Sequence, residues 1–513
     1  MMLAKWSSAE QFLGEKMRNN CIVCGLAAGS GEHVFPAALG GRRINRNIYC
    51  TKHDNGYSSL VAELANQVDV LNARLGVVPD HSKDVKSVLA RDANSGEEVK
   101  LSAKESVFTA PRVISQEPAG NGVLMNMSFP NREAMNQWLA EKKANGLDVT
   151  PLQKAQGQTY FLGEVHHQRC FGGPYGLGAV AYITQTFLAQ EFPDLARSSN
   201  VAQFIAYTQA IAALAQITGG SGEATDGPAD PRLELARQAL TAALAPWGGQ
   251  APVWWDFDPQ PDPTPNAFEF GHRVTVGVDT SDGQIFGRFS LFSSIHFSML
   301  FGTASAGVAT KTVTVDIDPM AAHTPNDIKR VEAASSIARV AVPALPTAGL
   351  ATAISSGSQE AVFTDLMRKI EAHSLAKSAA KIHAELAAYS TLSEFEGEQL
   401  VDRLIDGQAQ RVLNMTKWVL QNFKPRLPAE LLPVLGPMID AMTAHDPNST
   451  NGLSPMANAT LALAKSALAA QMREDIKDGR LDERRIAQLM GEGPGAAVVG
   501  QAVLTPITQA LGG

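Results

Sequence analysis

Apolar residues recur at helical spacing in several parts of the chain. From Tyr57 to Leu75 they follow an i, i+3 or i+4 pattern, which predicts a helix with one buried face. The same spacing predicts helices at 1–20 and 131–145 and a longer helical region over 176–217. Residues 76–130 contain glycine turns between apolar runs, and we expect strands there.

The second half of the chain changes from a strand pattern to a helix pattern. Apolar runs at 272–278, 285–292 and 312–317 predict strands, and Asp282-Gly283 predicts a hairpin turn between the first two. Residues 325–513 are rich in alanine and are interrupted by prolines. That composition predicts a set of separate helices.

Composition and charge exclude several classes of protein. The 513 residues are 45% hydrophobic and 18% charged, which suits packed cores and not a disordered chain. The net charge of −8 excludes nucleic-acid binding through bulk positive charge, so any such contact needs a local basic patch. Four cysteines are too few for a disulfide scaffold. Because no apolar run reaches the roughly 20 residues of a membrane span, we expect a cytoplasmic protein without a membrane partner.

Three of the four cysteines belong to a pattern of metal ligands. Cys21-x-x-Cys24 is followed, after 25 intervening residues, by Cys50-x-x-His53. Two pairs at this spacing are typical of a closed, tetrahedral zinc site. Gly25 follows the first pair and permits a tight turn. The sequence therefore predicts a structural Zn²⁺ bound by these four side chains.

The segment between the two pairs carries a second set of polar residues. Glu32-His33, the Gly40-Gly41 turn and Asn47 precede Cys50, and Asn55 follows the second pair. Over about residues 20–60 the sequence resembles the HNH endonucleases, the ββα-metal nucleases, in their zinc-stapled branch. The matching residues are Cys21, Cys24, Glu32, His33, Pro36, Gly40, Gly41, Asn47, Cys50 and Asn55. The resemblance implies metal-dependent hydrolysis of DNA that leaves a 5′-phosphate.

These residue types suit phosphodiester hydrolysis. A histidine titrates near neutral pH, so His33 suits the role of general base on water. Glu32 is a hard oxygen ligand of the kind that Mg²⁺ or Mn²⁺ prefers. The resemblance implies that Asn55 is the second ligand of this catalytic metal, with Asp54 as the alternative. It also implies that Asn47 braces the loop and orients the His33 imidazole.

Two features of this segment have alternative interpretations. His53 stands where the family usually has a cysteine, so it binds either the zinc or the catalytic metal, and its spacing from Cys50 favours the zinc. A local positive patch is interpreted either as a contact surface for nucleic acid or as an ordinary solvated loop. The patch consists of Arg42, Arg43, Arg46 and Lys52.

Two functions fit the pattern. The first is an active endonuclease, directed against foreign DNA, with DNA as the expected substrate and RNA as the alternative. The second is a zinc-stapled scaffold that binds nucleic acid or protein and whose HNH site is inactive. Intact Glu32, His33 and Asn47 favour the enzyme, because zinc binding alone needs none of them.

The expected architecture is α+β in three consecutive domains, in line with a prior of about 150 residues per domain. Residues 1–80 are the ββα-metal unit with its zinc knuckles. Residues 81–325 are a mixed α+β region, with target recognition or regulation as its candidate roles. Residues 326–513 are an Ala-rich helical region, a candidate surface for self-association or for docking a protein partner.

Overall fold

The computed structural model contains both helices and strands, which confirms the mixed α+β class. The helix expected at 1–20 lies almost wholly outside the described residues. The structure describes residues 19–512 apart from 81–84, 93–95, 104–105, 121, 152–164, 168–170, 220–229, 258–263, 280–281, 306–310, 334–357, 388–392, 445, 447–448 and 450–452.

The chain divides into two compact units that interleave along the sequence. The first joins Met1–Val88 with Gln168–Ile370, and the second joins Leu89–His167 with Glu371–Gly513. Helix α11 (Ser358–Ala387) runs across the boundary at residue 370. The consecutive domains expected from the sequence do not coincide with these units, because the N-terminal segment packs with the segment after residue 167.

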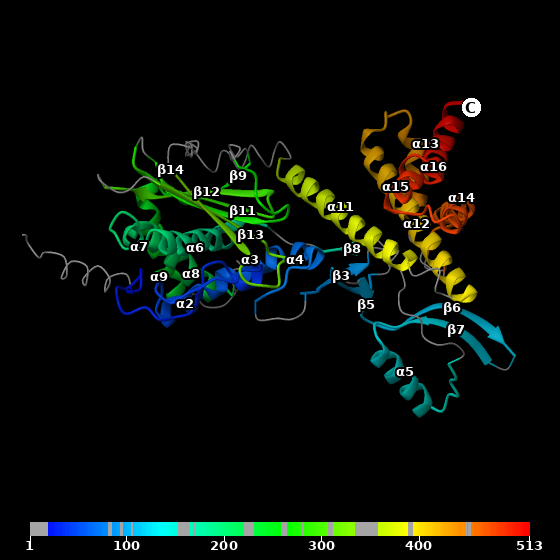
Figure 1. Cartoon of the computed structure of the whole chain (residues 1–513), viewed down its shortest axis with the longest axis horizontal. Helices are drawn as coiled ribbons and strands as arrows, with labels where there is room; N and C mark the ends of the chain where they lie inside the picture. Colours follow the sequence, from blue (N-terminus) through cyan, green and yellow to red (C-terminus); the bar gives the residue numbers. More distant parts are fainter. Residues whose placement is uncertain are drawn as a thin grey trace, which may run out of the picture. The chain divides into compact units, whose positions relative to one another are not determined.

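A six-stranded antiparallel sheet is the frame of the first unit (Figure 1). The strand order is β14-β13-β10-β11-β12-β9. The three predicted strands are confirmed, and the predicted hairpin turn has Gly283 at a φ of +70°. The strands are β9 (Val253–Asp256), β10 (His272–Val278), β11 (Gln284–Leu291), β12 (Ile295–Thr303), β13 (Lys311–Ile317) and β14 (Asp327–Ala333).

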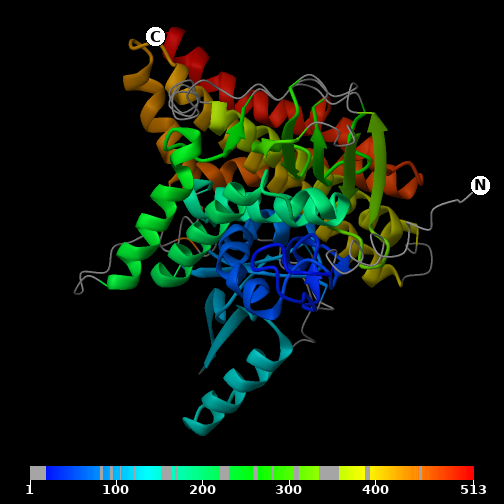
Figure 2. The ribbon, with the colours of Figure 1, turned by 90° about the vertical axis from the view of Figure 1, so that its left-hand side faces the viewer.

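Helices of the first unit cover one face of this sheet. Helix α6 (Gly173–Glu191) lies between the sheet and the N-terminal helices, as the teal ribbon in Figure 2 shows. The prediction of a single helix over 57–75 is wrong. The structure has two helices there, α3 (Ser58–Gln67) and α4 (Asp69–Leu75), which are separated at Val68. The helical region predicted at 176–217 contains α6, α7 (Pro193–Ala196) and α8 (Ala202–Thr218), and α9 (Pro231–Leu244) packs on α8.

The second unit contains the predicted C-terminal helices. They pack around a core of their own, in which α12, α14 and α16 contact one another. The helix expected at 131–145 is confirmed, with Asn131 as its N-cap. No helix in the described part of the chain is long and apolar enough to cross a membrane. The helices are α5 (Arg132–Ala144), α12 (Glu394–Phe423), α13 (Leu432–Thr443), α14 (Pro455–Lys477), α15 (Glu483–Gly491) and α16 (Pro494–Gly512).

Strands occupy 76–130, as the turns in that segment predicted. They form a hairpin and most of a small sheet, whose remaining strand is β8 (Val165–His166). The strands are β3 (Val88–Asp92), β4 (Glu98–Leu101), β5 (Ser106–Phe108), β6 (Arg112–Ala119) and β7 (Gly122–Ser128).

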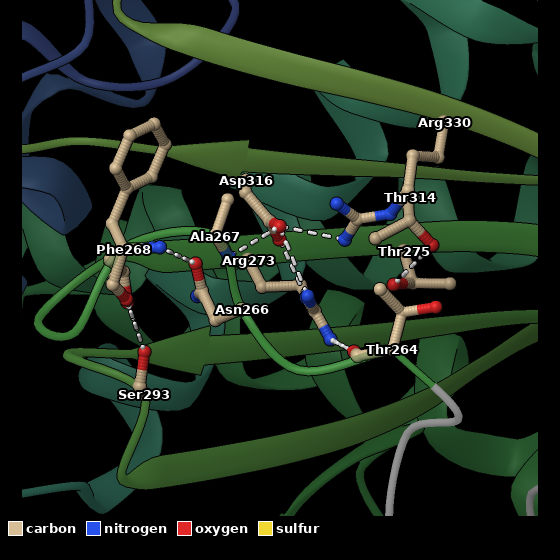
Figure 3. Close-up of polar contacts among 11 residues, drawn as sticks. Thr264, Asn266, Ala267, Phe268, Arg273, Thr275, Ser293, Thr314, Asp316 and Arg330 are labelled. Carbon is tan, nitrogen blue, oxygen red and sulfur yellow. Dashed lines mark hydrogen bonds and ion pairs between the residues drawn. The ribbon is translucent and has the colours of Figure 1, made fainter.

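A buried carboxylate fastens three strands of the six-stranded sheet (Figure 3). Asp316 on β13 is fully buried and accepts hydrogen bonds from Arg273 Nε on β10 at 2.6 Å and from Arg330 Nη2 on β14 at 2.6 Å. Burial alone would raise the pKa of Asp316, but the bonds from Arg273 and from the Ala267 amide lower it. Because folding lowers this pKa, the stabilisation is present above about pH 4 and is lost as the pH falls through the folded-state pKa.

Replacement of this carboxylate should destabilise the first unit. We expect Asp316→Asn to lower its free energy of unfolding by about 3–5 kcal/mol, because Arg273 would stay buried without a counter-charge. Urea unfolding followed by circular dichroism measures the change. Asp365→Asn is the matched control: its ion pairs with Arg368 and Lys369 are exposed, so we expect a change within about 1 kcal/mol. Equal losses in the two variants would contradict this account of Asp316.

Candidate functional site

The N-terminal segment forms a short hairpin followed by a helix. Strand β1 (Glu32–His33) pairs antiparallel with β2 (Ile44–Asn45), and α2 (Thr51–Gly56) follows. Opposite residues of an antiparallel pair share a face, so Glu32 lies on the side of Asn45 and His33 on the side of Ile44. The order strand, strand, helix is the order that a ββα unit requires.

The turn of the hairpin contacts the sheet directly. A Cβ atom on Gly40, which has a φ of +87°, would lie 2.6 Å from Cα of Pro319, and one on Gly41 would lie 1.9 Å from the Phe35 carbonyl oxygen. Neither position has room for a side chain. Asn326 Nδ2 also donates to the Gly40 carbonyl at 2.8 Å. Gly40 therefore fixes the hairpin against the loop that joins β13 and β14, and Gly41 lets the turn close on Phe35.

The two predicted ligand pairs meet in one cluster. Donor atoms of Cys21, Cys24, Cys50 and His53 all lie within 4.8 Å of one another. A tetrahedral zinc with ordinary bond lengths separates two sulfurs by about 3.8 Å and a sulfur from a nitrogen by about 3.6 Å. Here Cys24 Sγ lies 3.9 Å from Cys50 Sγ, and His53 Nδ1 lies 3.2–3.6 Å from the sulfurs of Cys50 and Cys21. The cluster could hold a metal ion such as zinc.

Local backbone geometry and electrostatics also suit a metal ion. Gly25 has a φ of +70°, and its amide closes the first turn on the Cys21 carbonyl at 2.9 Å. Desolvation, and then the charge of Lys52, lowers the pKa of His53, which favours the neutral imidazole that a metal needs. Partial desolvation and the neighbouring Cys21 thiol raise the pKa of Cys24. A bound cation would offset this cost of ionising neighbouring thiols.

His33 contacts a carboxylate that the sequence analysis did not identify. Its Nε2 lies 3.0 Å from Asp80 Oδ2, and Arg42 Nη1 donates to Asp80 Oδ1 at 2.7 Å. The His33 and Asp80 side chains are partly exposed, whereas that of Arg42 is only 5% exposed. The contact with His33, and then that with Arg42, lowers the pKa of Asp80.

The structure distinguishes Asp54 from Asn55. The Asp54 carboxylate accepts a hydrogen bond from the Ser30 hydroxyl, so it lies close to the residues that lead into β1. Asn55 is exposed, and its backbone carbonyl accepts from Ser58 Oγ at 2.9 Å. Asp54 therefore contacts the segment that leads into β1, whereas Asn55 faces solvent.

Asn47 is exposed, and its contacts in the structure come from its backbone. Its amide donates to Asn45 Oδ1 at 2.7 Å, and its carbonyl accepts from Arg197 Nη2 at 2.6 Å. The side chain that braces this loop is therefore that of Asn45, whose amide also donates to Gln190. The role expected of Asn47 towards His33 stays a prediction, and Asp80 is a carboxylate that contacts His33 Nε2.

The four basic residues of the predicted patch have different environments. Arg42 faces inward on Asp80, and Arg43 pairs with Asp327 at 2.7 Å. Arg46 and Lys52 are exposed. The guanidinium of Arg46 lies over Gly31, where an added Cβ would be 3.6 Å from Arg46 Cζ. Arg46 and Lys52 are the members of the patch that face solvent.

No protein-family model, curated protein or solved structure matches this chain. Within the described ranges, the cluster of three cysteines and His53 is the one group of three or more histidine, cysteine or acidic side chains placed to hold a metal ion.

Metal content tests the cluster directly. We expect the purified chain to contain one zinc ion, and Cys50→Ser and His53→Ala to lose most of it, because each removes one of four ligands. Inductively coupled plasma mass spectrometry measures the ratio of zinc to protein. The controls are Cys170→Ser, which changes the cysteine outside the ligand pattern, and His33→Ala. Zinc loss in either control, or retention in His53→Ala, would contradict the assignment.

Proposed function

We propose that this chain is a metal-dependent endonuclease of the HNH, or ββα-metal, type that hydrolyses phosphodiester bonds in DNA. RNA is the alternative substrate. The observation that supports this most directly is the arrangement of β1 and α2. Glu32 and His33 lie on a hairpin fixed to a large sheet, and α2 carries a zinc ligand and an oxygen ligand on neighbouring residues, His53 and Asp54.

Two kinds of metal ion suit two kinds of ligand in this segment. Cysteine sulfur and histidine nitrogen bind Zn²⁺, and a closed set of four ligands gives it a structural role. The carboxylates of Glu32 and Asp54 are hard donors that suit Mg²⁺ or Mn²⁺. When bound, that cation would take up negative charge on the phosphate and on the leaving oxygen.

His33 supplies the proton chemistry. Its imidazole accepts a proton from a water molecule, and the water oxygen then forms a bond to phosphorus. The bond from phosphorus to the 3′ oxygen breaks and this oxygen takes a proton from solvent water, so the products are a 5′-phosphate and a 3′-hydroxyl. The imidazole suits this role because one ring nitrogen can accept a proton while the other donates a hydrogen bond.

The exposed cations favour contact with a phosphate backbone at this place. Arg46 directly follows β2, and Lys52 lies in the first turn of α2, so the two cations are on either side of Cys50 in the sequence. The net charge of −8 acts against binding elsewhere on the chain. Contact through two cations gives a weak, strongly salt-dependent interaction. Selection of a target, including foreign DNA, would then depend on other parts of the chain.

Removal of the general base should abolish cleavage. We expect His33→Ala to cut plasmid DNA in Mg²⁺ or Mn²⁺ about 10²- to 10⁴-fold more slowly than the wild type, which is the usual contribution of a general base. Gel assays on plasmid, linear and single-stranded DNA and on RNA, with EDTA as a blank, measure this. His323→Ala, at an exposed histidine, is the matched control and should cut at the wild-type rate.

The same assay separates the enzyme from the scaffold. Cutting that survives both EDTA and His33→Ala would contradict the proposal. If the zinc-loaded wild type cuts no substrate, even in lysate of its source cell, the chain is the zinc-stapled scaffold that the sequence analysis gave as the alternative.

The identity of the second metal ligand is tested by neighbouring substitutions. Asp54→Ala should lower cleavage at least as much as His33→Ala and should raise the Mn²⁺ concentration needed for half-maximal rate, because it removes a charged oxygen ligand. Asn55→Ala should change the rate less than about threefold, since its side chain faces solvent. Cleavage at 1–10 mM Mn²⁺ measures both. The reverse order of effects would restore Asn55 as the ligand.

A further inference from the structure

We propose that Asp80 is a positioning residue for His33, held in place by Arg42. This inference rests on the proposed function, because it assigns the group that orients the general base of that site. Asp80 lies 47 residues after His33 in the chain and follows α4. It has no counterpart among the residues that carry the resemblance to the HNH family.

The geometry fixes which imidazole nitrogen is protonated. Ionised Asp80 is a pure acceptor, so the 3.0 Å contact requires a proton on His33 Nε2. A neutral imidazole in this tautomer has its lone pair on Nδ1. Nδ1 is therefore the atom that takes the proton from water, and the hydrogen bond to Asp80 sets the plane of the ring.

Arg42 holds the carboxylate in this orientation. Besides its bond to Asp80 Oδ1, its Nη2 donates to the carbonyl of Val78 at 2.7 Å and to that of Ala321 at 3.3 Å. These acceptors lie on the segment after α4 and on the loop between β13 and β14. The guanidinium thus joins Asp80 to the sheet that also contacts the Gly40 turn. The contacts with His33 and then with Arg42 lower the pKa of Asp80, so Asp80 orients the imidazole as a carboxylate.

Kinetics of Asp80 variants distinguish positioning from a purely structural ion pair. We expect Asp80→Ala to lower kcat about 10- to 100-fold, as removal of an orienting partner does, with KM within about twofold of the wild type. Asp80→Glu should restore part of kcat. Asp80→Asn should resemble Asp80→Ala, because the amide has one acceptor oxygen and both His33 and Arg42 donate to this side chain.

A matched variant controls for loss of an ion pair in the same unit. Asp327 pairs with Arg43 at 2.7 Å, so Asp327→Asn removes a comparable contact without changing His33. We expect its kcat and KM to equal those of the wild type. Zinc content and the circular dichroism spectrum should be unchanged in every variant. A kcat unchanged in Asp80→Ala, or lowered equally in Asp327→Asn, would overturn the assignment.

A spectroscopic measurement tests the contact without any activity. In the full chain labelled with ¹⁵N-histidine, the His33 ring should give the pattern of a proton fixed on Nε2, and His33→Ala identifies the signal. In Asp80→Asn the ring should show a mixture of tautomers. If the wild type cuts nothing, the proposed function fails, while this spectrum still decides whether Asp80 orients the ring. A mixture of tautomers in the wild type would overturn the inference.

Discussion

The contact between the Gly40–Gly41 turn and the backbone of Pro319 is the constraint on which the candidate site depends. Strands β1 and β2 have two residues each, too few for a hairpin that is stable alone. Their stability therefore comes from the sheet. Phe35 stacks on His272 with ring centroids 5.1 Å apart, and burial lowers the pKa of His272 to about 3, so the ring packs in its neutral form. A side chain at Gly40 would separate the hairpin from this support, and one at Gly41 would clash with the Phe35 carbonyl within the turn.

In the proposed enzyme, helix α2 carries ligands of two chemically different metal sites. Soft sulfur ligands select zinc, whereas carboxylate oxygens select Mg²⁺ or Mn²⁺, so neighbouring residues can serve different ions without competition. His53 closes the cluster, and Asp54 turns towards Ser30 and β1. A zinc ion bound in this cluster would fix the start of α2 and thereby the position of Asp54. Loss of zinc would then change the position of Asp54 in the proposed active site, because the backbone of α2 would no longer be fixed.

Local spacing made part of this structure predictable. Some signals span only a few residues each, and the structure agrees with them. They are the x2 pairs ending in Cys24 and His53 and the apolar run at 272–278. Contacts between residues that are far apart in the chain could not be predicted from local spacing. Asp80 is 47 residues from His33. Arg42 belongs by sequence to a basic patch, whereas in the structure it donates to Asp80. The interleaving of the two units follows from the packing of segments far apart in the chain, which periodicity does not encode.

Anomalous diffraction from crystals of the full chain grown with Mn²⁺ would test the central proposal most directly. Data at the zinc and manganese absorption edges locate each metal separately. We predict a zinc peak within the four-ligand cluster and a manganese peak between the carboxylates of Glu32 and Asp54. A manganese peak at His53, or none beside Glu32 while zinc fills its cluster, would contradict the proposal that this hairpin and helix form a nuclease active site.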